Sequence, residues 1–344
     1  MATVSTIIAD IISLSPDERI ALKDRLIKMF NPQASTMEEF VKNERFSGGM
    51  VCPLCGGFHI VRNGHRKDGV QKYVCKDCGK SFVTTANSIV SSTRKDFSVW
   101  EKFIDCMING FSVRKSATIC GIHKNTAFAW RHKVLGALQN MADSVIMDGI
   151  IEADETFFVS SYKGNHRRGT FKMPRKARKR GKSNHIRGIS NEQVCVPCAV
   201  NRKGLSIAKA TNLGRITTKN LHTVYDGRIG SGSVMVTDQM NSYRRFTKTN
   251  GIGLIQVKDH KTKKGIYNIQ HINSYHSELK RFMCNFKGVS TKHLNNYLIW
   301  HNFVNYALES EVDKRSILLK FALTQNMLIY VRNIAKKPAM PFAI

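Results

Sequence analysis

Four cysteines in two C-x-x-C pairs, Cys52 with Cys55 and Cys75 with Cys78, have types and spacing that suit a metal ion. Nineteen residues separate the pairs, as in a zinc ribbon, where two hairpin turns close a tetrahedral site. Four thiolates leave no open position, so we predict one structural Zn²⁺. Incidental cysteines and the disulfides of a secreted domain are the alternatives, and the paired spacing disfavours both.

Two aspartates stand at the ends of apolar, strand-like runs. Asp154 follows residues 149–153 and Asp238 follows residues 233–237. Strand ends present side chains to a cleft, where two neighbouring carboxylates repel unless a cation separates them. Mg²⁺ suits such a site, and two such ions promote in-line displacement at phosphorus. Either aspartate alone is more simply a residue that ends a strand; the pair favours a metal site if other features of the chain indicate a nucleic-acid partner.

The composition points to a polyanionic partner. Lys and Arg number 54 against 25 Asp and Glu, which gives a formal charge of +29 over 344 residues. Nucleic acid is the leading partner on this evidence. We predict no contact with a membrane, because the longest apolar candidate, residues 316–331, is interrupted by Lys320, Gln325 and Asn326. The nine cysteines, with no secretion signal in the sequence, predict a reducing, cytoplasmic compartment.

The N-terminal third divides into three predicted parts. Residues 1–45 combine helical patterns, one starting at Ser15, with a linker over residues 31–44. Residues 46–92 form the zinc ribbon, whose connecting loop carries Arg66 and Lys67, which we expect to contact DNA. Residues 93–145 hold three helices, over residues 97–109, 112–120 and 123–138.

These three helices fit a helix-turn-helix, with Gly121 at the tight turn. The third helix would then bring Lys124, Asn125 and Arg131 to the major groove of DNA. The alternative is an ordinary three-helix bundle with a solvated basic face. The adjacent ribbon and the overall charge favour DNA binding.

From about residue 146 the pattern changes to short strands, over residues 149–158, 193–200, 205–210, 233–237 and 253–257. Helical stretches follow at residues 273–285 and 291–308, which predicts an α/β domain with a mixed sheet over residues 146–308. A basic insertion, residues 163–187, contains eleven Lys or Arg and no acid. We interpret it as an arm that orders on DNA rather than a solvated linker. Its predicted DNA-binding residues are Arg175, Lys176, Arg178, Lys179 and Arg180. Residues 309–344 are predicted to form a helical tail that supports dimerisation.

Three short sequence blocks contain the candidate catalytic residues: IEADET from Ile151, VTDQMNSY from Val236 and HINSYHSELK from His271. They resemble, in the same order, the catalytic blocks of the ISXO-type bacterial insertion-sequence transposases of the DDE superfamily. The resemblance covers about residues 46–308. It implies a multidomain α+β chain: N-terminal helices, a zinc ribbon, a helix-turn-helix and then an α/β ribonuclease-H-like domain with a mixed sheet.

The resemblance also implies roles for single residues. Asp154 and Asp238 would hold two Mg²⁺ or Mn²⁺ ions, and Asn273 would take the third position, where glutamate is usual. An asparagine brings no charge, so we expect weaker metal affinity. Lys280 would neutralise a phosphate. Glu278, about 500° round the helix from Asn273, is a backup ligand only.

Glu152 and Glu155 flank Asp154 and are expected to orient or tune it, with Glu152 on the Asp154 face of the strand. His276 is expected to be a packed histidine, with contact to DNA or the transition state as the alternative.

The function implied is that of a DNA transposase. It would bind terminal inverted repeats, cleave one strand with the help of metal ions and join the freed 3′-hydroxyl to target DNA. The partners would be double-stranded DNA, both element ends and target, and at least a second copy of the chain, on the nucleoid of a bacterial cytoplasm. The neutral Asn273 keeps open a non-catalytic DNA-binding regulator. A structure-selective nuclease is a third possibility.

Overall fold

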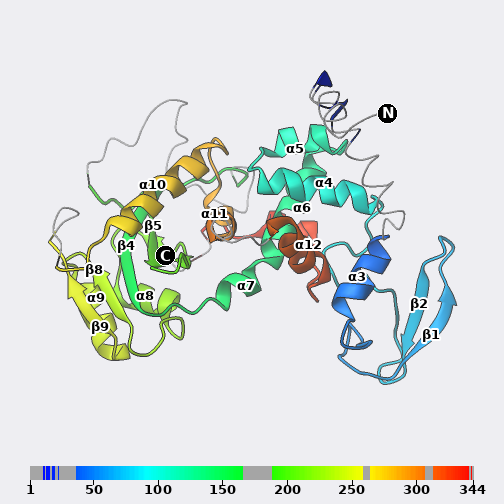
Figure 1. Ribbon diagram of the computed structural model, residues 1–344, viewed down its shortest axis with the longest axis horizontal. Helices are drawn as coiled ribbons and strands as arrows, with labels where there is room; N and C mark the ends of the chain where they lie inside the picture. The colour runs from blue at the N-terminus through cyan, green and yellow to red at the C-terminus, as the bar shows by residue number, and fades with distance from the viewer. Residues whose placement is uncertain are drawn as a thin grey trace, which may run out of the picture. The chain divides into compact units, whose positions relative to one another are not determined.

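The computed structural model describes residues 11, 13–15, 18, 19, 22, 36–165, 188–258, 264–306, 313–340 and 342. The chain forms two compact units, residues 1–85 and residues 86–344 (Figure 1). The helices predicted within residues 1–30 lie almost entirely outside the described residues. Five predicted DNA-binding residues lie wholly outside them: Arg175, Lys176, Arg178, Lys179 and Arg180.

The first unit contains a helix where a linker is expected. Helix α3 (Met37–Arg45) begins at Thr36, whose side chain accepts from the Glu39 amide while the Glu39 carboxylate accepts from the Thr36 amide. This capping box satisfies two backbone donors that would otherwise lack partners, and Met37 and Val41 are buried. The linker prediction is therefore wrong over the residues of α3.

The rest of the first unit is a small antiparallel sheet. Its strands are β1 (Ile60–His65), β2 (Gln71–Cys75) and β3 (Ser81–Phe82), in the order β1-β2-β3. The rings of Tyr73 and Phe82 stack across β2 and β3 with centroids 5.8 Å apart. So small a sheet buries little apolar surface, and modules of this kind depend on a metal for stability.

The second unit begins with three helices close to their predicted bounds: α4 (Phe97–Ile108), α5 (Val113–Ile119) and α6 (Lys124–Ala137). Trp100 of α4 stacks on Trp130 of α6 with ring centroids 3.7 Å apart, and Phe103 meets Trp130 edge-on. A short helix, α7 (Gln139–Asp143), then leads to the sheet. The periodicity of the sequence thus located all three helices.

The sheet of the second unit is mixed, as expected. Its strands are β4 (Ile150–Val159), β5 (Gln193–Asn201), β6 (Ser206–Ala208), β7 (Asn212–Leu213), β8 (Val234–Thr237) and β9 (Gly253–Gln256). Their order is β6-β5-β4-β8-β9, with β7 paired to β5. The pairs β4–β5 and β5–β6 are antiparallel, whereas β4–β8 and β8–β9 are parallel. The prediction of a mixed α/β architecture is confirmed.

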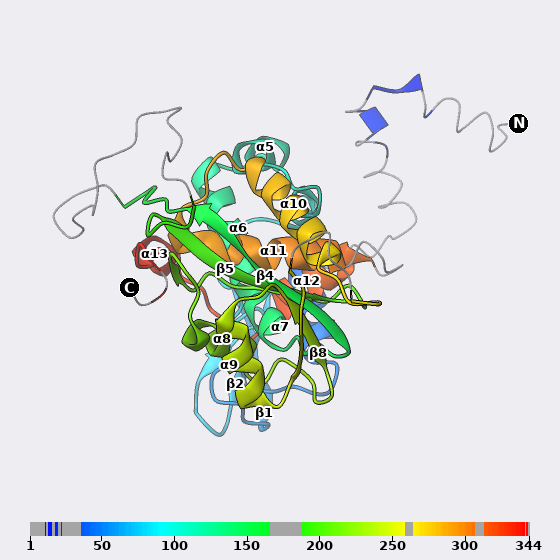
Figure 2. The ribbon, with the colours of Figure 1, turned by 90° about the vertical axis from the view of Figure 1, so that its left-hand side faces the viewer.

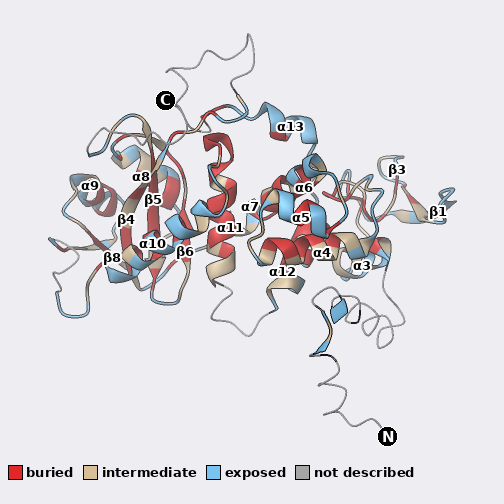
Figure 3. Ribbon diagram, turned by 90° about the horizontal axis from the view of Figure 1, so that it is seen from above, coloured by how far each residue is buried: buried red, intermediate tan, exposed pale blue. Residues whose placement is uncertain are grey.

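Helices cover both faces of this sheet (Figure 2). On one face, α8 (Thr218–Tyr225) and α9 (Asn241–Asn250) pack against Ile151 and Ala153. On the other, α10 (Gln270–Cys284) and α11 (Leu294–Tyr306) pack against alternate residues of β5 and β8. The strands β4 and β5 and the helix α11 are largely buried (Figure 3). Because strand side chains alternate, the even-numbered residues of β4 face α10.

The C-terminal residues form α12 (Lys314–Thr324) and α13 (Val331–Lys336). Arg315 of α12 forms ion pairs with Glu101 and Asp105 of α4 at 3.2 and 3.1 Å. The apolar side of α12, with Leu318 and Leu323, is buried inside the unit. This tail is helical as expected, but its apolar side serves packing within the chain. Among the described residues, no helix has the length and apolarity to cross a membrane.

Candidate active site

Asp154 lies on β4, and Asp238 directly follows β8, the parallel neighbour of β4. The register between β4 and β8 pairs Ile150 with Val234 and Glu152 with Val236. Continued for two residues, this register would set Asp154 beside Asp238, because adjacent strands run about 4.8 Å apart. Asp154 is an even-numbered residue of β4, as Glu152 is, and therefore faces α10. The charge of Asp238 acts on Asp154, so the structure brings the two predicted carboxylates near each other.

The electrostatics of Asp154 reflect this position. The pKa of Asp154 is raised to about 6, chiefly by burial and also by the charge of Asp238, while Lys280 of α10 opposes the shift. The Oδ1 atom of Asp238 accepts a hydrogen bond from the Met240 amide at 3.0 Å. A partly buried carboxylate beside a second one favours binding of a cation, which removes the repulsion between them.

Helix α10 places three polar residues along one edge of its buried side. Asn273, His276 and Lys280 recur at intervals of three and four residues, so they form one stripe on the helix. Asn273 is partly buried and His276 is buried. The Nδ1 atom of His276 lies 3.9 Å from Asp154 Oδ2. This approach was not predictable from the sequence, because it depends on how α10 docks.

Glu152 links β4 to the start of α10. Its side chain is 1% exposed, and its Oε2 accepts from the backbone amides of His271 and Ile272 at 2.7 and 3.1 Å. Its Oε1 lies 3.0 Å from Arg202 Nη2 and 2.8 Å from His271 Nδ1. The carboxylate thus occupies the N-terminal end of α10, where backbone donors and the helix dipole favour negative charge. Glu152 therefore fixes the start of α10 against β4.

Glu155 lies on the opposite face of β4 from Asp154. Burial raises its pKa to about 8, and the charges of Asp154 and Asp238 add to the shift, which Tyr243 partly offsets. Its Oε1 is buried and has no hydrogen-bond partner among the described residues. Glu155 is therefore a protonated carboxyl of the sheet interior near neutral pH, separate from the pair of aspartates.

Glu278 does not serve as a backup ligand. Its carboxylate accepts hydrogen bonds from Ser274 at 3.4 Å and from Asn305 of α11 at 3.3 Å. Ser274 and Glu278 are exposed residues of α10, whereas Asn273 is partly buried and His276 is buried. The prediction fails because five residues along a helix turn the side chain well away from its starting direction.

The four cysteines are brought together as predicted. All four Sγ atoms lie within 4.8 Å of one another, with Cys52 and Cys78 3.9 Å apart and Cys55 and Cys75 3.7 Å apart. Four sulfurs about 2.3 Å from one tetrahedral ion would lie about 3.8 Å apart. The cluster therefore fits Zn²⁺. Among the described residues it is the one group of three or more Cys, His, Asp or Glu side chains with ligand atoms this close.

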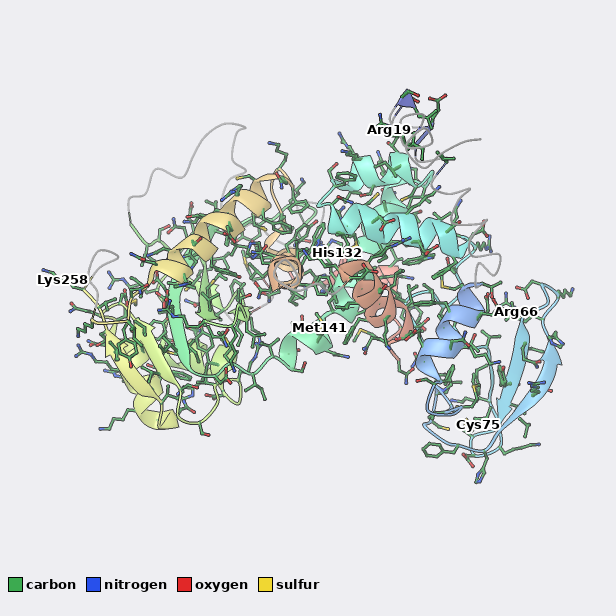
Figure 4. All side chains as sticks on the ribbon, viewed as in Figure 1. Arg19, Arg66, Cys75, His132, Met141 and Lys258 are labelled. Atoms are coloured by element: carbon green, nitrogen blue, oxygen red, sulfur yellow. The ribbon has the colours of Figure 1, made fainter. Side chains whose placement is uncertain are left out.

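The predicted DNA-binding residues differ in their exposure to solvent. Arg66 and Lys67 are exposed at the β1–β2 turn, where Arg66 pairs with Asp68. Figure 4 labels Arg66 and Cys75 at opposite ends of this hairpin, so the basic turn and the cysteines are separated. Lys124 and Asn125 are exposed at the start of α6.

Arg131 is not available to DNA. Its side chain is buried, and its guanidinium donates to the carbonyl oxygen of Phe111 and lies 4.9 Å from the ring centroid of Trp300. Its neighbour His132, labelled in Figure 4, stacks on His293 with centroids 4.0 Å apart. The second half of α6 is thus packed against α11 and the residues just before it, which explains why the prediction for Arg131 is wrong.

The sequence is similar to known proteins of transposable elements. Residues 146–303 match the family model of the ISXO2-like transposase domain. A protein of Halobacterium salinarum, described as an uncharacterized protein in transposable element ISH50, is 21% identical over 257 residues, which are 74% of this chain and 84% of that protein.

Two solved structures are also similar. One is a Mos1 transposase paired-end complex with the left transposon end, with a TM-score of 0.23 and 8% identity over 60% of this chain and 75% of that chain. The other is a pre-cleavage Mos1 transpososome, with a TM-score of 0.20 and 8% identity over 68% and 78%.

Proposed function

Because the chain belongs to the ISXO2-like transposase family through residues 146–303, we propose that it is the DNA transposase of an insertion sequence. It binds the terminal inverted repeats of the element, cleaves a strand at each end and transfers the freed 3′-hydroxyl to target DNA. The observation that carries this proposal is the position of Asp154, on β4, near Asp238, which directly follows the parallel strand β8, together with the helix α10 that bears Asn273 and Lys280.

The donor set fits the divalent ions that phosphoryl transfer uses. Asp154, Asp238 and Asn273 offer oxygen atoms, which Mg²⁺ and Mn²⁺ prefer. When bound, two such ions would activate the attacking oxygen and stabilise the leaving one. The chain itself positions these ligands through β4, β8 and α10, and Lys280 adds positive charge next to Asp154, where a DNA phosphate would lie.

We also propose a role for each domain of the chain. Residues 46–92 are proposed as a zinc ribbon with one structural Zn²⁺, and residues 93–145 as a helix-turn-helix that reads element ends through Lys124 and Asn125. Residues 146–308 are proposed as a ribonuclease-H-like catalytic domain with a basic insertion at 163–187, which would bind DNA through its arginines and lysines. Residues 1–45 and 309–344 flank these three domains.

The partners follow from the reaction. Two element ends must be held together, so we propose a homodimer or a larger synaptic complex on double-stranded DNA. The net charge of +29 supports this partner. The protein would act on the nucleoid in the bacterial cytoplasm.

The test is cleavage of a duplex that carries the element end, by the full-length protein with Mg²⁺ or Mn²⁺. We expect nicking in wild type and a loss of at least about a hundredfold in Asp154→Asn, since removing a group that stabilises developing charge costs this much. Joining of the nicked end to a second duplex separates a transposase from a simple nuclease. Tight binding of the end without cleavage in either metal would overturn the proposal and indicate a regulator.

A further inference from the structure

His276 of α10 is a buried histidine whose Nε2 has no hydrogen-bond partner among the described residues. The residue is 8% exposed. Its Nδ1 lies 3.9 Å from Asp154 Oδ2, which is too far for a hydrogen bond. Buried polar atoms are almost always paired, so a ring held in this way at a carboxylate calls for an explanation.

The spacing between the two atoms is that of two ligands on one ion. Ligand atoms that each lie about 2.1 Å from a metal are about 3.0 Å apart at a right angle and about 4.2 Å apart on opposite sides. The 3.9 Å between His276 Nδ1 and Asp154 Oδ2 falls within this interval. The same distance is too short for an intervening water, which needs about 2.8 Å to each partner and about 4.5 Å or more in all.

The position of His276 is fixed from two directions. Its neighbours on α10, Tyr275 and Leu279, are buried in the core beneath the helix. The start of the helix is held to β4 by the hydrogen bonds to Glu152. A ligand oriented in this way loses little conformational freedom when it binds an ion.

We propose that His276 is a metal ligand of the active site and shares an ion with Asp154. The inference rests on the proposed function and changes its chemistry. Asn273, one helical turn before His276, would then lie at the edge of the site, with no contact to Asp154 or Asp238 recorded among the described residues. Because imidazole nitrogen is a softer ligand than oxygen, the site prefers Mn²⁺ and similar transition metals to Mg²⁺.

The experiment measures Mn²⁺ binding directly by electron paramagnetic resonance on the full-length, zinc-loaded protein without DNA. In wild type we expect pulsed spectra to show coupling of bound Mn²⁺ to a ¹⁴N nucleus. His276→Ala should remove this coupling and weaken Mn²⁺ binding at least about tenfold. His276→Glu should restore binding and favour Mg²⁺, because a carboxylate replaces the imidazole.

The controls separate the two proposals. His222→Ala removes an imidazole from α8, on the opposite face of the sheet, and should leave the nitrogen coupling intact. If wild type binds Mn²⁺ through Asp154 but shows no nitrogen coupling, His276 is not a ligand and the proposed function stands. If Asp154→Asn leaves Mn²⁺ binding unchanged, the metal site itself is absent and both proposals fail. The wild-type spectrum decides the matter even if a His276 variant does not fold.

Discussion

The carboxylate of Glu152 accepts a hydrogen bond from the backbone amide of His271 at 2.7 Å, although 119 positions separate the two residues in sequence. This bond fixes the start of α10 against β4, two residues before Asp154. From that point the helix carries Asn273, His276 and Lys280 past the carboxylates. The position of α10 above the site therefore depends on this one buried acid.

Replacement of Glu152 should release the start of α10. Glu152→Ala removes the acceptor for two backbone amides and the partner of Arg202, so we expect a loss of about 3 kcal/mol in the free energy of unfolding. Urea unfolding measures this loss, and hydrogen exchange with mass spectrometry should show faster exchange at His271 and Ile272. Asp148→Asn is a matched control, because its ion pair with Lys203 is exposed and should contribute less than about 1 kcal/mol. Equal losses in the two variants would contradict the special role of Glu152.

Arg131 and Lys124, seven residues apart on α6, should behave in opposite ways. Arg131→Met leaves the carbonyl oxygen of Phe111 without its donor and removes the cation over Trp300, so we expect about 2 to 3 kcal/mol of destabilisation. Lys124→Ala should leave stability within about 0.5 kcal/mol of wild type. It should weaken DNA binding instead and lower the salt slope by about 1, as expected for one lost phosphate contact.

Thermal unfolding and DNA titration at several salt concentrations check both variants. The interpretation of Arg131 fails if Arg131→Met keeps its stability and loses DNA affinity.

This contrast marks a limit of what the sequence predicts. Seven residues are about two helical turns, so Lys124 and Arg131 have the same direction from the helix axis. Periodicity therefore assigns both to one face. Only the packing of α11 against the second half of α6, through Trp300, shows that this face is exposed at its start and buried further on.

The candidate active site also combines features that the sequence predicts with features that it does not. The position of Asp238 at the end of a strand was predictable, because the apolar run before it ends there. Asp154 was expected at a strand end as well, but it lies in the middle of β4, which continues to Val159. The approach of His276 to Asp154 was not predictable, since it depends on the docking of α10. Helix α3 was missed despite an available signal, the Thr36-x-x-Glu39 capping box. Helix α9 was missed because it is short and mostly polar.

Removal of metal from the cysteine cluster should unfold the first unit alone. The Sγ positions of Cys52, Cys55, Cys75 and Cys78 are those of a tetrahedral site, and the small sheet around them has little other support. Cys75→Ser should lower bound zinc from one per chain to about zero, measured by atomic absorption. Proteolysis should then cut within residues 36–85 while the second unit persists, with its stacked Trp100 and Trp130. Cys284→Ser, at an exposed cysteine outside the cluster, is the control and should keep its zinc.

The buried carboxyl of Glu155 should make stability depend on pH. Its pKa is about 8 in the folded protein, because burial penalises its charge, and its ordinary value is 4.5. Between these values the folded state binds more protons than the unfolded state, so stability is full below about pH 4.5 and falls as the pH rises to about 8. The slope attributable to this group is at most about 1.4 kcal/mol per pH unit.

Glu155→Gln keeps the shape of the protonated acid and cannot ionise. It should match wild type at pH 5 and exceed it by about 2 to 4 kcal/mol at pH 8, in urea unfolding without added divalent ions. Glu278→Gln changes an exposed glutamate and should retain the wild-type pH profile. Parallel pH profiles for wild type and Glu155→Gln would mean that Glu155 is ionised in the folded protein, which requires a cationic or hydrogen-bonding partner for its buried Oε1 beyond the described residues.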